Sequence, residues 1–462
     1  MNTISSQNPF FETYSTLHST VPFDKIKTGD YVPAIREGIR RQNAEIEAII
    51  RNPEVPTFAN TVLAYEKSGE MLHRVSTVFG NLLSAETDDD LQELAKEIMP
   101  MMSEHENNIS LNEELFARIK AVYKQQDKET LSPEQHKLLE DIYNGFVRNG
   151  ANLLGEDKEK YRALCKELSL LTLQFSENNL KETNDYKLVI TDKSQLAGLP
   201  ESAVEAAAET AGEKGVEGWV FTLQAPSYGP FLTYADSRDL RRELYMAYNT
   251  KCTHDNASNN LEIVKKLANV RMEIAQLLGY DNFAEYNLQE RMAQNSESVY
   301  KLLDQLLEAY TPTAKQEYAE VQALARQAEG EDFVLMPWDW AYYSHKLKDR
   351  KFNIDDELLR PYFELNNVKQ GVFGLATRLY GITFKKNPDI PVYHKDVDAY
   401  EVFDKDGKFL AVFYTDFHPR AGKRSGAWMT SYKEQWIDEK TGENSRCLLY
   451  TSPSPRDGLL SR

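Results

Sequence analysis

Apolar side chains recur along most of this chain every three or four residues, the spacing of an α-helix with one buried face. The clearest helix start is Ser132-Pro133-Glu134-Gln135, an N-cap serine, a proline at the first helical position and a capping-box glutamine. We interpret three apolar stripes as core-packing faces rather than cofactor sites. They are Leu138, Leu139, Ile142, Tyr143, Phe146 and Val147; Tyr161, Leu164, Cys165, Leu168, Leu171 and Phe175; and Val299, Leu302, Leu303, Leu306, Leu307 and Tyr310.

The third stripe belongs to a helix in which Pro312 predicts a kink and Gly330 predicts the end. Strand patterns are few and short. They occur at Tyr186 to Thr191, at Gly218 to Leu223, and in a hairpin that pairs Tyr400 to Phe403 with Phe409 to Tyr414. The expected fold class is therefore mostly α, with a small β-sheet or hairpin.

Composition narrows the class of protein further. At 462 residues the chain is too long for one core, so two or three packed units are expected. The formal charge of −18 disfavours binding to nucleic acid and to anionic membrane surfaces, because like charges repel. We predict neither partner.

The cysteines, the N-terminal segment and the lack of long apolar stretches indicate in which cellular compartment the protein is expected. Cys165, Cys252 and Cys447 are far apart and form no CxxC, so neither a disulfide framework nor a thiolate zinc site is indicated. Cys165 is expected to be a small core residue. Met1 to Lys27 shows no basic segment followed by an apolar run, and no stretch of eighteen apolar residues occurs. A cytoplasmic location is expected.

A search for zinc ligands finds no HExxH motif, in which two histidines one helical turn apart bind the metal. Only His105 is followed by glutamate, and the run His105-Glu106-Asn107-Asn108-Ile109 lacks the second histidine. We interpret His105 as a histidine on a surface helix or loop.

Other pairs of polar residues give no complete site. His254-Asp255 and His394-Lys395-Asp396 each lack a third ligand, and His394 and His418 flank the predicted hairpin, which leaves a contact between these two rings open without favouring a metal site. The run from Asp404 to Gly407 faintly resembles a calcium loop, but a hairpin turn explains it and Thr415 stands where an EF-hand needs glutamate.

The segment Arg420-Ala421-Gly422-Lys423-Arg424 is a basic spot in an acidic protein. It either holds a carboxylate ligand through charge-assisted hydrogen bonds or pairs with neighbouring acids, and we favour the second.

Six segments, in this order and spacing, resemble the thimet oligopeptidase and dipeptidyl carboxypeptidase family of zinc metallopeptidases. The resemblance covers residues 8–446, and the last two segments are closest to the dipeptidyl carboxypeptidase branch. The segments are Pro56 to Thr61 with Glu66 to Gly69; Phe146 to Ala151; Gly198 to Ser202; Pro226 to Tyr228 with Arg238 to Arg241; Trp338 to Tyr343; and Phe413 to Asp416 with Arg420 to Met429.

For a complete protein this resemblance implies a two-lobed, helical, neurolysin-like architecture with a narrow channel that admits short, unfolded peptides. Zn2+ on the channel floor is implied to polarise the scissile carbonyl and activate water, with the motif glutamate as general base. A monomer that releases C-terminal dipeptides is expected. Trp338, Trp340, Tyr342 and Tyr343 are expected to pack between the lobes or, as the alternative, to line the channel.

In the family the HExxH helix follows the segment that ends at Met429, and no such motif occurs here. No catalytic, cofactor-binding or metal residue is therefore carried over, and we predict that the chain as written is inactive, binds no zinc and dissolves poorly. An endo-acting oligopeptidase and a non-catalytic helical peptide-binding module remain alternatives.

The expected organisation has four parts. Residues 1–185 form an N-terminal helical lobe, 186–235 short strands and a connection, 236–446 the start of the peptidase domain, and 447–462 a non-native tail. The tail reads CLLYTSPSPRDGLLSR and resembles translated adapter sequence. Genomic DNA that encodes the same residues in frame would contradict the last assignment.

Overall fold

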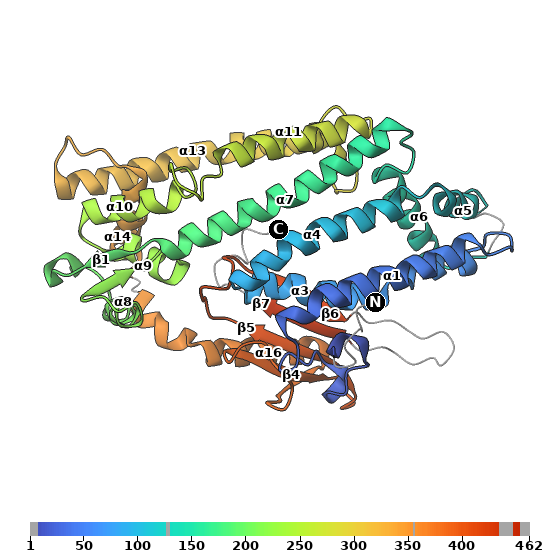
Figure 1. Ribbon diagram of the computed structural model, residues 1–462. Coiled ribbons are helices and arrows are strands. Elements are labelled where there is room, and N and C mark those ends of the chain that lie inside the picture. Colours follow the sequence, from blue (N-terminus) through green and yellow to red (C-terminus); the bar gives the residue numbers. More distant parts are fainter. Residues whose placement is uncertain (1–7, 126–129, 354–355, 434–446, 453–462) are drawn as a thin grey trace. The chain divides into compact units, whose positions relative to one another are not determined.

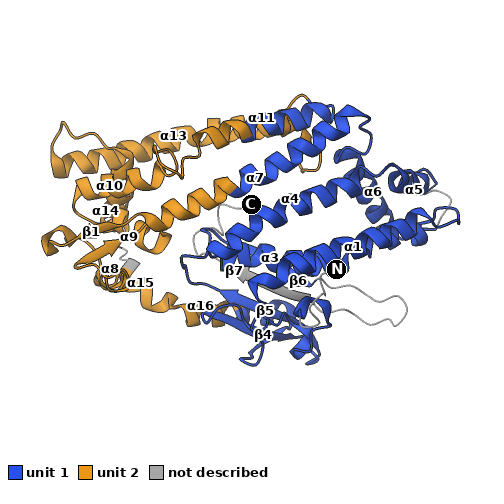
Figure 2. Ribbon diagram, viewed as in Figure 1, with its two compact units in different colours: residues 1–173, 267–280, 373–462 blue, residues 174–266, 281–372 orange. Residues whose placement is uncertain are grey.

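The computed structural model describes residues 8–125, 130–353, 356–433 and 447–452. The described residues are mostly helical, with two small β-sheets, which confirms the expected fold class. It divides into two compact units, coloured separately in Figure 2. Unit 1 consists of residues 1–173, 267–280 and 373–462, and unit 2 of residues 174–266 and 281–372.

Unit 1 begins with short 3-10 turns and continues in long helices (Figure 1). These elements are η1 (Pro9–Phe11), η2 (Leu17–Ser19), η3 (Thr28–Asp30), α1 (Tyr31–Ile50), η4 (Phe58–Leu63), α2 (Ala64–Glu66), α3 (Glu70–Ala85), α4 (Asp89–Ser110), α5 (Glu113–Lys124) and α6 (Pro133–Arg148). Three further helices cross the boundary between the units: α7 (Glu156–Asp185), α11 (Leu261–Leu277) and α16 (Leu365–Tyr380).

The predicted start of α6 is confirmed in atomic detail. The Ser132 side chain accepts a hydrogen bond from the Gln135 amide, and the Gln135 side chain accepts one from the Ser132 amide. Leu139 and Phe146 of the predicted stripe are buried. Thr57 and Asn60 form the same reciprocal cap on η4, which has π-helical geometry.

Unit 1 also contains a five-stranded sheet in the order β3-β4-β5-β7-β6. Its pairs are antiparallel except β5 with β7, which is parallel. The predicted hairpin is confirmed by β4 and β5, whereas β3, β6 and β7 were not predicted. The strands are β3 (Thr383–Lys386), β4 (Val397–Phe403), β5 (Phe409–Asp416), β6 (Trp428–Lys433) and β7 (Cys447–Ser452).

The main core of unit 1 lies between this sheet and the helices α1, α3 and α4 (Figure 1). Strand residues Val412, Tyr414 and Tyr432 pack in one cluster with Ile35 and Phe79 of the helices. Because inward side chains alternate along a strand while every third or fourth residue faces inward on a helix, the two patterns meet in one apolar layer. A second cluster joins the far end of α1 to α5 and α6.

Unit 2 combines a two-stranded antiparallel sheet with helices. Both strands were predicted, and their side chains pack against α8, α9 and α10. The elements are β1 (Leu188–Ile190), η6 (Lys193–Leu196), α8 (Glu201–Glu213), β2 (Trp219–Phe221), α9 (Ala225–Tyr234), α10 (Arg238–Asn249), α12 (Phe283–Leu288), α13 (Ser296–Glu329), η7 (Pro337–Asp339), α14 (Trp340–Phe352), α15 (Asp356–Leu359) and η8 (Arg360–Phe363).

Helix α13 corrects one expectation. Gly330 ends it as predicted, with a positive φ of 110°, and the helix runs through Pro312. Its apolar stripe, however, is not core: Leu302, Leu303 and Leu307 are more than half exposed. Periodicity shows that one face of a helix is apolar, but not that the partner of that face is present.

Candidate functional site

The predicted basic segment forms an ion network at the end of β5. Arg420 makes two parallel hydrogen bonds to the Asp416 carboxylate, each 2.8 Å long, and its Nε donates to Glu86 at the end of α3. The same guanidinium donates to the backbone carbonyl of Ala85 at 2.5 Å. A paired guanidinium with this geometry has little capacity left for a ligand.

Lys423 and Tyr393 complete the surroundings of Asp416. The Lys423 ammonium donates to the Asp416 carbonyl at 2.8 Å and lies 3.0 Å from carboxylate Oδ1, while the Tyr393 hydroxyl donates to Oδ2 at 2.8 Å. Burial alone would raise the pKa of Asp416, but the hydrogen bonds from Arg420 and Tyr393 and the charge of Lys423 lower it to about 2. Asp416 is therefore a buried anion with its acceptor sites occupied.

Backbone contacts hold the basic segment against the turn after α3. The Thr87 amide donates to the Gly422 carbonyl at 2.7 Å, and the Arg424 amide donates to the Ser84 carbonyl at 2.9 Å. A Cβ on Gly422 would lie 2.4 Å from the Thr87 carbonyl oxygen, so only glycine fits this approach. The segment therefore pairs with neighbouring acids and backbone, which is the alternative that we favoured.

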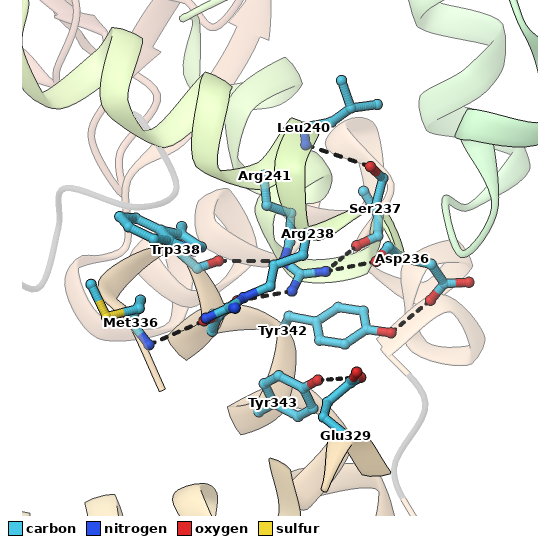
Figure 3. A network of polar contacts seen from close by, with 12 residues as sticks. Asp236, Ser237, Arg238, Leu240, Arg241, Glu329, Met336, Trp338, Tyr342 and Tyr343 are labelled. Carbon is cyan, nitrogen blue, oxygen red and sulfur yellow. Dashed lines mark hydrogen bonds and ion pairs between the residues drawn. The ribbon is translucent and has the colours of Figure 1, made fainter. Parts of the chain in front are cut away.

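A second network lies in unit 2 and joins the start of α10 to η7 (Figure 3). Asp339 is fully buried between Arg238, whose Nη2 lies 2.7 Å from Oδ2, and Arg241, whose Nη2 lies 3.0 Å from Oδ1. The Met336 amide donates to the same carboxylate at 3.1 Å. Arg241 also donates to the carbonyls of Ala235 and Asp236, at 2.8 and 3.1 Å.

The aromatic segment after Asp339 packs on these charges (Figure 3). The Arg241 guanidinium lies 4.0 Å from the centre of the Tyr342 ring, and the Tyr342 hydroxyl donates to Asp236 at 2.7 Å. Tyr343 donates to Glu329 at 2.7 Å. Burial, reinforced by these carboxylates, raises the pKa of both tyrosines, so both remain neutral donors at ordinary pH.

Both tyrosines thus belong to the interior of unit 2, and the tryptophans beside them make contacts within the same unit. The Arg241 Nε donates a hydrogen bond to the Trp338 carbonyl at 3.4 Å. The rings of Trp340 and Tyr318 stack with their centroids 6.3 Å apart. Whether these four aromatic residues pack between lobes or line a channel stays a prediction.

One histidine corrects an expectation. His105 is not at the surface: it is 3% exposed, its Nε2 is 2.8 Å from Gln42 Oε1 of α1, and burial lowers its pKa. His254 lies 3.8 Å from Glu182, and His394 accepts a bond from the Asp396 amide at 3.2 Å.

The predicted turn at Asp404 is confirmed, since its carboxylate accepts from the amides of Asp406 and Lys408 rather than facing an ion. Within the described ranges, no group of three His, Cys, Asp or Glu is placed to hold a metal ion. The zinc that the resemblance implies thus has no ligand set among those residues.

Comparisons with known proteins decide the family. A model of peptidase family M3 matches residues 231–455, the stretch that carries the Asp339 and Asp416 networks. Dipeptidyl carboxypeptidase of Escherichia coli (strain K12) is 39% identical over 441 residues, which is 95% of this chain. This chain belongs to peptidase family M3.

Two further relatives carry the name oligopeptidase A rather than dipeptidyl carboxypeptidase. Oligopeptidase A of Escherichia coli (strain K12) is 33% identical over 88% of this chain, and the probable cytosolic oligopeptidase A of Arabidopsis thaliana is 33% identical over 92%. The chain spans 64%, 60% and 61% of the length of these three relatives, less than two thirds in each case.

The sequence did not reveal the role of Asp339 or Asp416. A usable signal was present in each case. Arg238 and Arg241 are three residues apart and so share one face of α10, and Asp339 is the lone acid in an aromatic run. Asp416 likewise ends an apolar strand. What the sequence did not show is which charges meet, because Arg238 and Asp339 are 101 positions apart.

In the described part of the chain, no helix is both long and apolar enough to cross a lipid bilayer.

Proposed function

We propose that the complete protein is a zinc-dependent peptidase that hydrolyses short peptides and releases dipeptides from their C-termini. The observation that carries this proposal is the identity of 39% over 95% of the chain with a dipeptidyl carboxypeptidase, against 33% over 88% with oligopeptidase A. We propose a monomer that acts in the cytoplasm on peptides alone.

In this proposal the present chain supplies scaffold and not the reacting groups. Its two ion networks are internally paired, so they hold the ends of β5 and α10 in place rather than bind substrate. The 462 residues contain no HExxH motif, and the described residues offer no three-donor group. The chain as written is therefore proposed to be inactive and to bind no zinc tightly.

An endo-acting oligopeptidase is the second candidate, favoured by the relatives named oligopeptidase A. The test uses the complete protein and two peptides that differ only at the C-terminus, one with a free carboxylate and one amidated. A peptidyl-dipeptidase must bind the free carboxylate, so amidation is expected to abolish cleavage. Equal cleavage of both peptides at internal bonds would support the oligopeptidase instead.

A non-catalytic peptide-binding module is the third candidate, since the sequence lacks HExxH. Sequencing the source DNA beyond the codon for Arg446 separates it from the enzyme. We propose that the frame continues into an HExxH helix and that residues 447–462 are foreign. A frame that ends after Arg462 would overturn this and make peptide binding the function to test.

A further inference from the structure

Two asparagine-glycine steps lie in or next to α6: Asn144-Gly145 and Asn149-Gly150. In such a step the nitrogen after the asparagine can attack its side chain, because glycine has no Cβ to hinder the close approach. The 462 residues contain no third step of this kind. The two positions differ, since Asn144 lies inside the helix and Asn149 is the C-cap at its end.

The C-terminal end of α6 is a Schellman turn. The Ala151 amide donates to the Phe146 carbonyl at 3.0 Å, and the Gly150 amide donates to the Val147 carbonyl at 3.3 Å. Gly150 has a φ of 87°, and a Cβ on it would lie 2.9 Å from Leu153 Cδ1. Glycine is therefore required at this position, so the turn itself keeps the reactive step in the sequence.

The Asn149 side chain is exposed, and its amide donates to the Gly145 carbonyl at 2.9 Å. The attacking group is the Gly150 nitrogen, whose hydrogen bond of 3.3 Å exceeds about 3.2 Å, the upper end of ordinary N–H···O distances. Helix ends open at almost no cost in free energy, whereas an interior turn opens only with more of the fold. Asn149 therefore needs only one terminal turn to open, while Asn144 is held in the hydrogen-bond ladder of the helix.

The reaction is an exchange of ammonia for water. The Gly150 nitrogen bonds to Cγ of Asn149, and the bond from Cγ to Nδ2 breaks. Nδ2 leaves as ammonia with the Gly150 amide proton, so that a cyclic succinimide remains. One water then opens either carbonyl of the ring and gives aspartate or isoaspartate. Water is the only reactant besides the chain.

We propose that Asn149 is a deamidation site of the folded chain and that the reaction weakens the C-terminal end of α6. The product carboxylate cannot donate to the Gly145 carbonyl, so that hydrogen bond is lost. Its negative charge lies at the end of the helix where the dipole is already negative. Phe146 and Ala151 of the same turn are buried in one cluster with Phe116 of α5, so the weakened end lies in the packing of two helices.

Peptide mapping by mass spectrometry, during incubation of the folded chain at mildly alkaline pH, tests the site. Trypsin cleaves after Arg148 and so places Asn144 and Asn149 in different peptides. Asn149 is expected to deamidate at least about tenfold faster than Asn144. Labelling by isoaspartyl methyltransferase identifies the isoaspartate product, and a sample digested before incubation corrects for reaction during digestion.

The chain unfolded in guanidinium chloride is the control for the contribution of structure. Both steps should react there at similar rates, because both are Asn-Gly and neither is held in a helix. In the folded chain, equal rates at the two positions or a faster reaction at Asn144 would overturn the proposal. So would the absence of reaction at Asn149 over a period in which the unfolded chain reacts.

Variants test the effect on α6 without the slow reaction. Asn149→Asp introduces the product charge directly and is expected to lower the urea midpoint of unfolding. Asn152→Asp makes the same change of charge at an exposed position beyond the helix and should leave the midpoint unchanged. Equal midpoints for the two variants would contradict the weakening of α6. The deamidation site does not depend on the proposed peptidase activity.

Discussion

The guanidinium of Arg241 lies 3.0 Å from the carboxylate of Asp339, and both side chains are at most 1% exposed. Charges removed from water to this degree are stable only when paired and fully hydrogen-bonded. Asp339 meets this condition through Arg238, Arg241 and the Met336 amide. The pair links α10 to η7, two elements of unit 2 that are about a hundred positions apart in the sequence.

Asp339→Asn is expected to destabilise unit 2 by about 3–5 kcal/mol, because it leaves the buried Arg241 without its counter-ion. Urea unfolding followed by tyrosine and tryptophan fluorescence measures the change. Glu97→Gln breaks the exposed pair with Arg36 and is the matched control, expected to leave the midpoint unchanged. Equal midpoints for both variants would show that the Asp339 network contributes little.

The pH dependence of unfolding should report Asp416. Its pKa is about 2 in the folded chain against a usual value of 3.8, so it stabilises the fold above pH 4 and the contribution is lost as pH falls toward 2. The loss is expected to be about 2 kcal/mol. Unfolding measured between pH 5 and 2 tests this, and Asp416→Asn should flatten that part of the profile. An unchanged slope in the variant would contradict the assignment.

Gly422→Ala is expected to destabilise unit 1 by about 1–3 kcal/mol, because its Cβ would lie 2.4 Å from the Thr87 carbonyl oxygen. Gly80→Ala is the control, since Gly80 lies mid-helix in α3 with no atom within 4 Å of the added Cβ. It should stabilise by roughly 0.5–1 kcal/mol. Thermal unfolding of the two variants should therefore shift in opposite directions, and a shift in the same direction would count against the close approach.

Glu401→Gln is expected to loosen the N-terminal segment from β4. His18 has a φ of 56°, stacks on Phe409 at 3.7 Å and lies 2.6 Å from Glu401, and the hydrogen bond from His18 lowers the pKa of Glu401 although burial opposes this. The pair therefore stabilises the folded chain at pH values above the usual pKa of a glutamate. This contribution is lost as the pH falls through the lowered pKa of Glu401.

Limited proteolysis within residues 12–24 measures this attachment. Faster cleavage is expected in Glu401→Gln and not in Glu12→Gln, a change at an exposed position of the same segment. Equal cleavage rates would show that the His18 pair does not hold the segment.

Local structure was predictable from sequence where local chemistry decides it. The Ser132 cap needs only four residues, and the hairpin at Asp404 needs only a turn between two apolar runs. Strand β7 was not predicted, because its place between β5 and β6 depends on pairing with residues far away in sequence. Its pairing does not decide whether residues 447–462 are native, and their foreign origin stays a proposal.

The wrong predictions concern which side chains are covered by neighbouring helices, and not where helices and strands form. His105 was expected at the surface and is buried, since its hydrogen bond to Gln42 joins two helices that the sequence does not show to be neighbours. The apolar stripe of α13, which includes Leu302, Leu303 and Leu307, was also expected in the core and is exposed. The helix was predicted correctly for α13, whereas helix or loop was left open for His105, and in neither case did the local sequence show which residues cover the side chain.

Zinc content and dipeptide release by the 462-residue chain, measured beside the intact Escherichia coli dipeptidyl carboxypeptidase, test the central claim most directly. After dialysis against metal-free buffer the chain is expected to retain no stoichiometric zinc and to release no dipeptide from a short peptide with a free C-terminus, while the relative releases it. One bound zinc per chain, or dipeptide release by the chain alone, would contradict the claim that this part of an M3 peptidase is scaffold without the reacting groups.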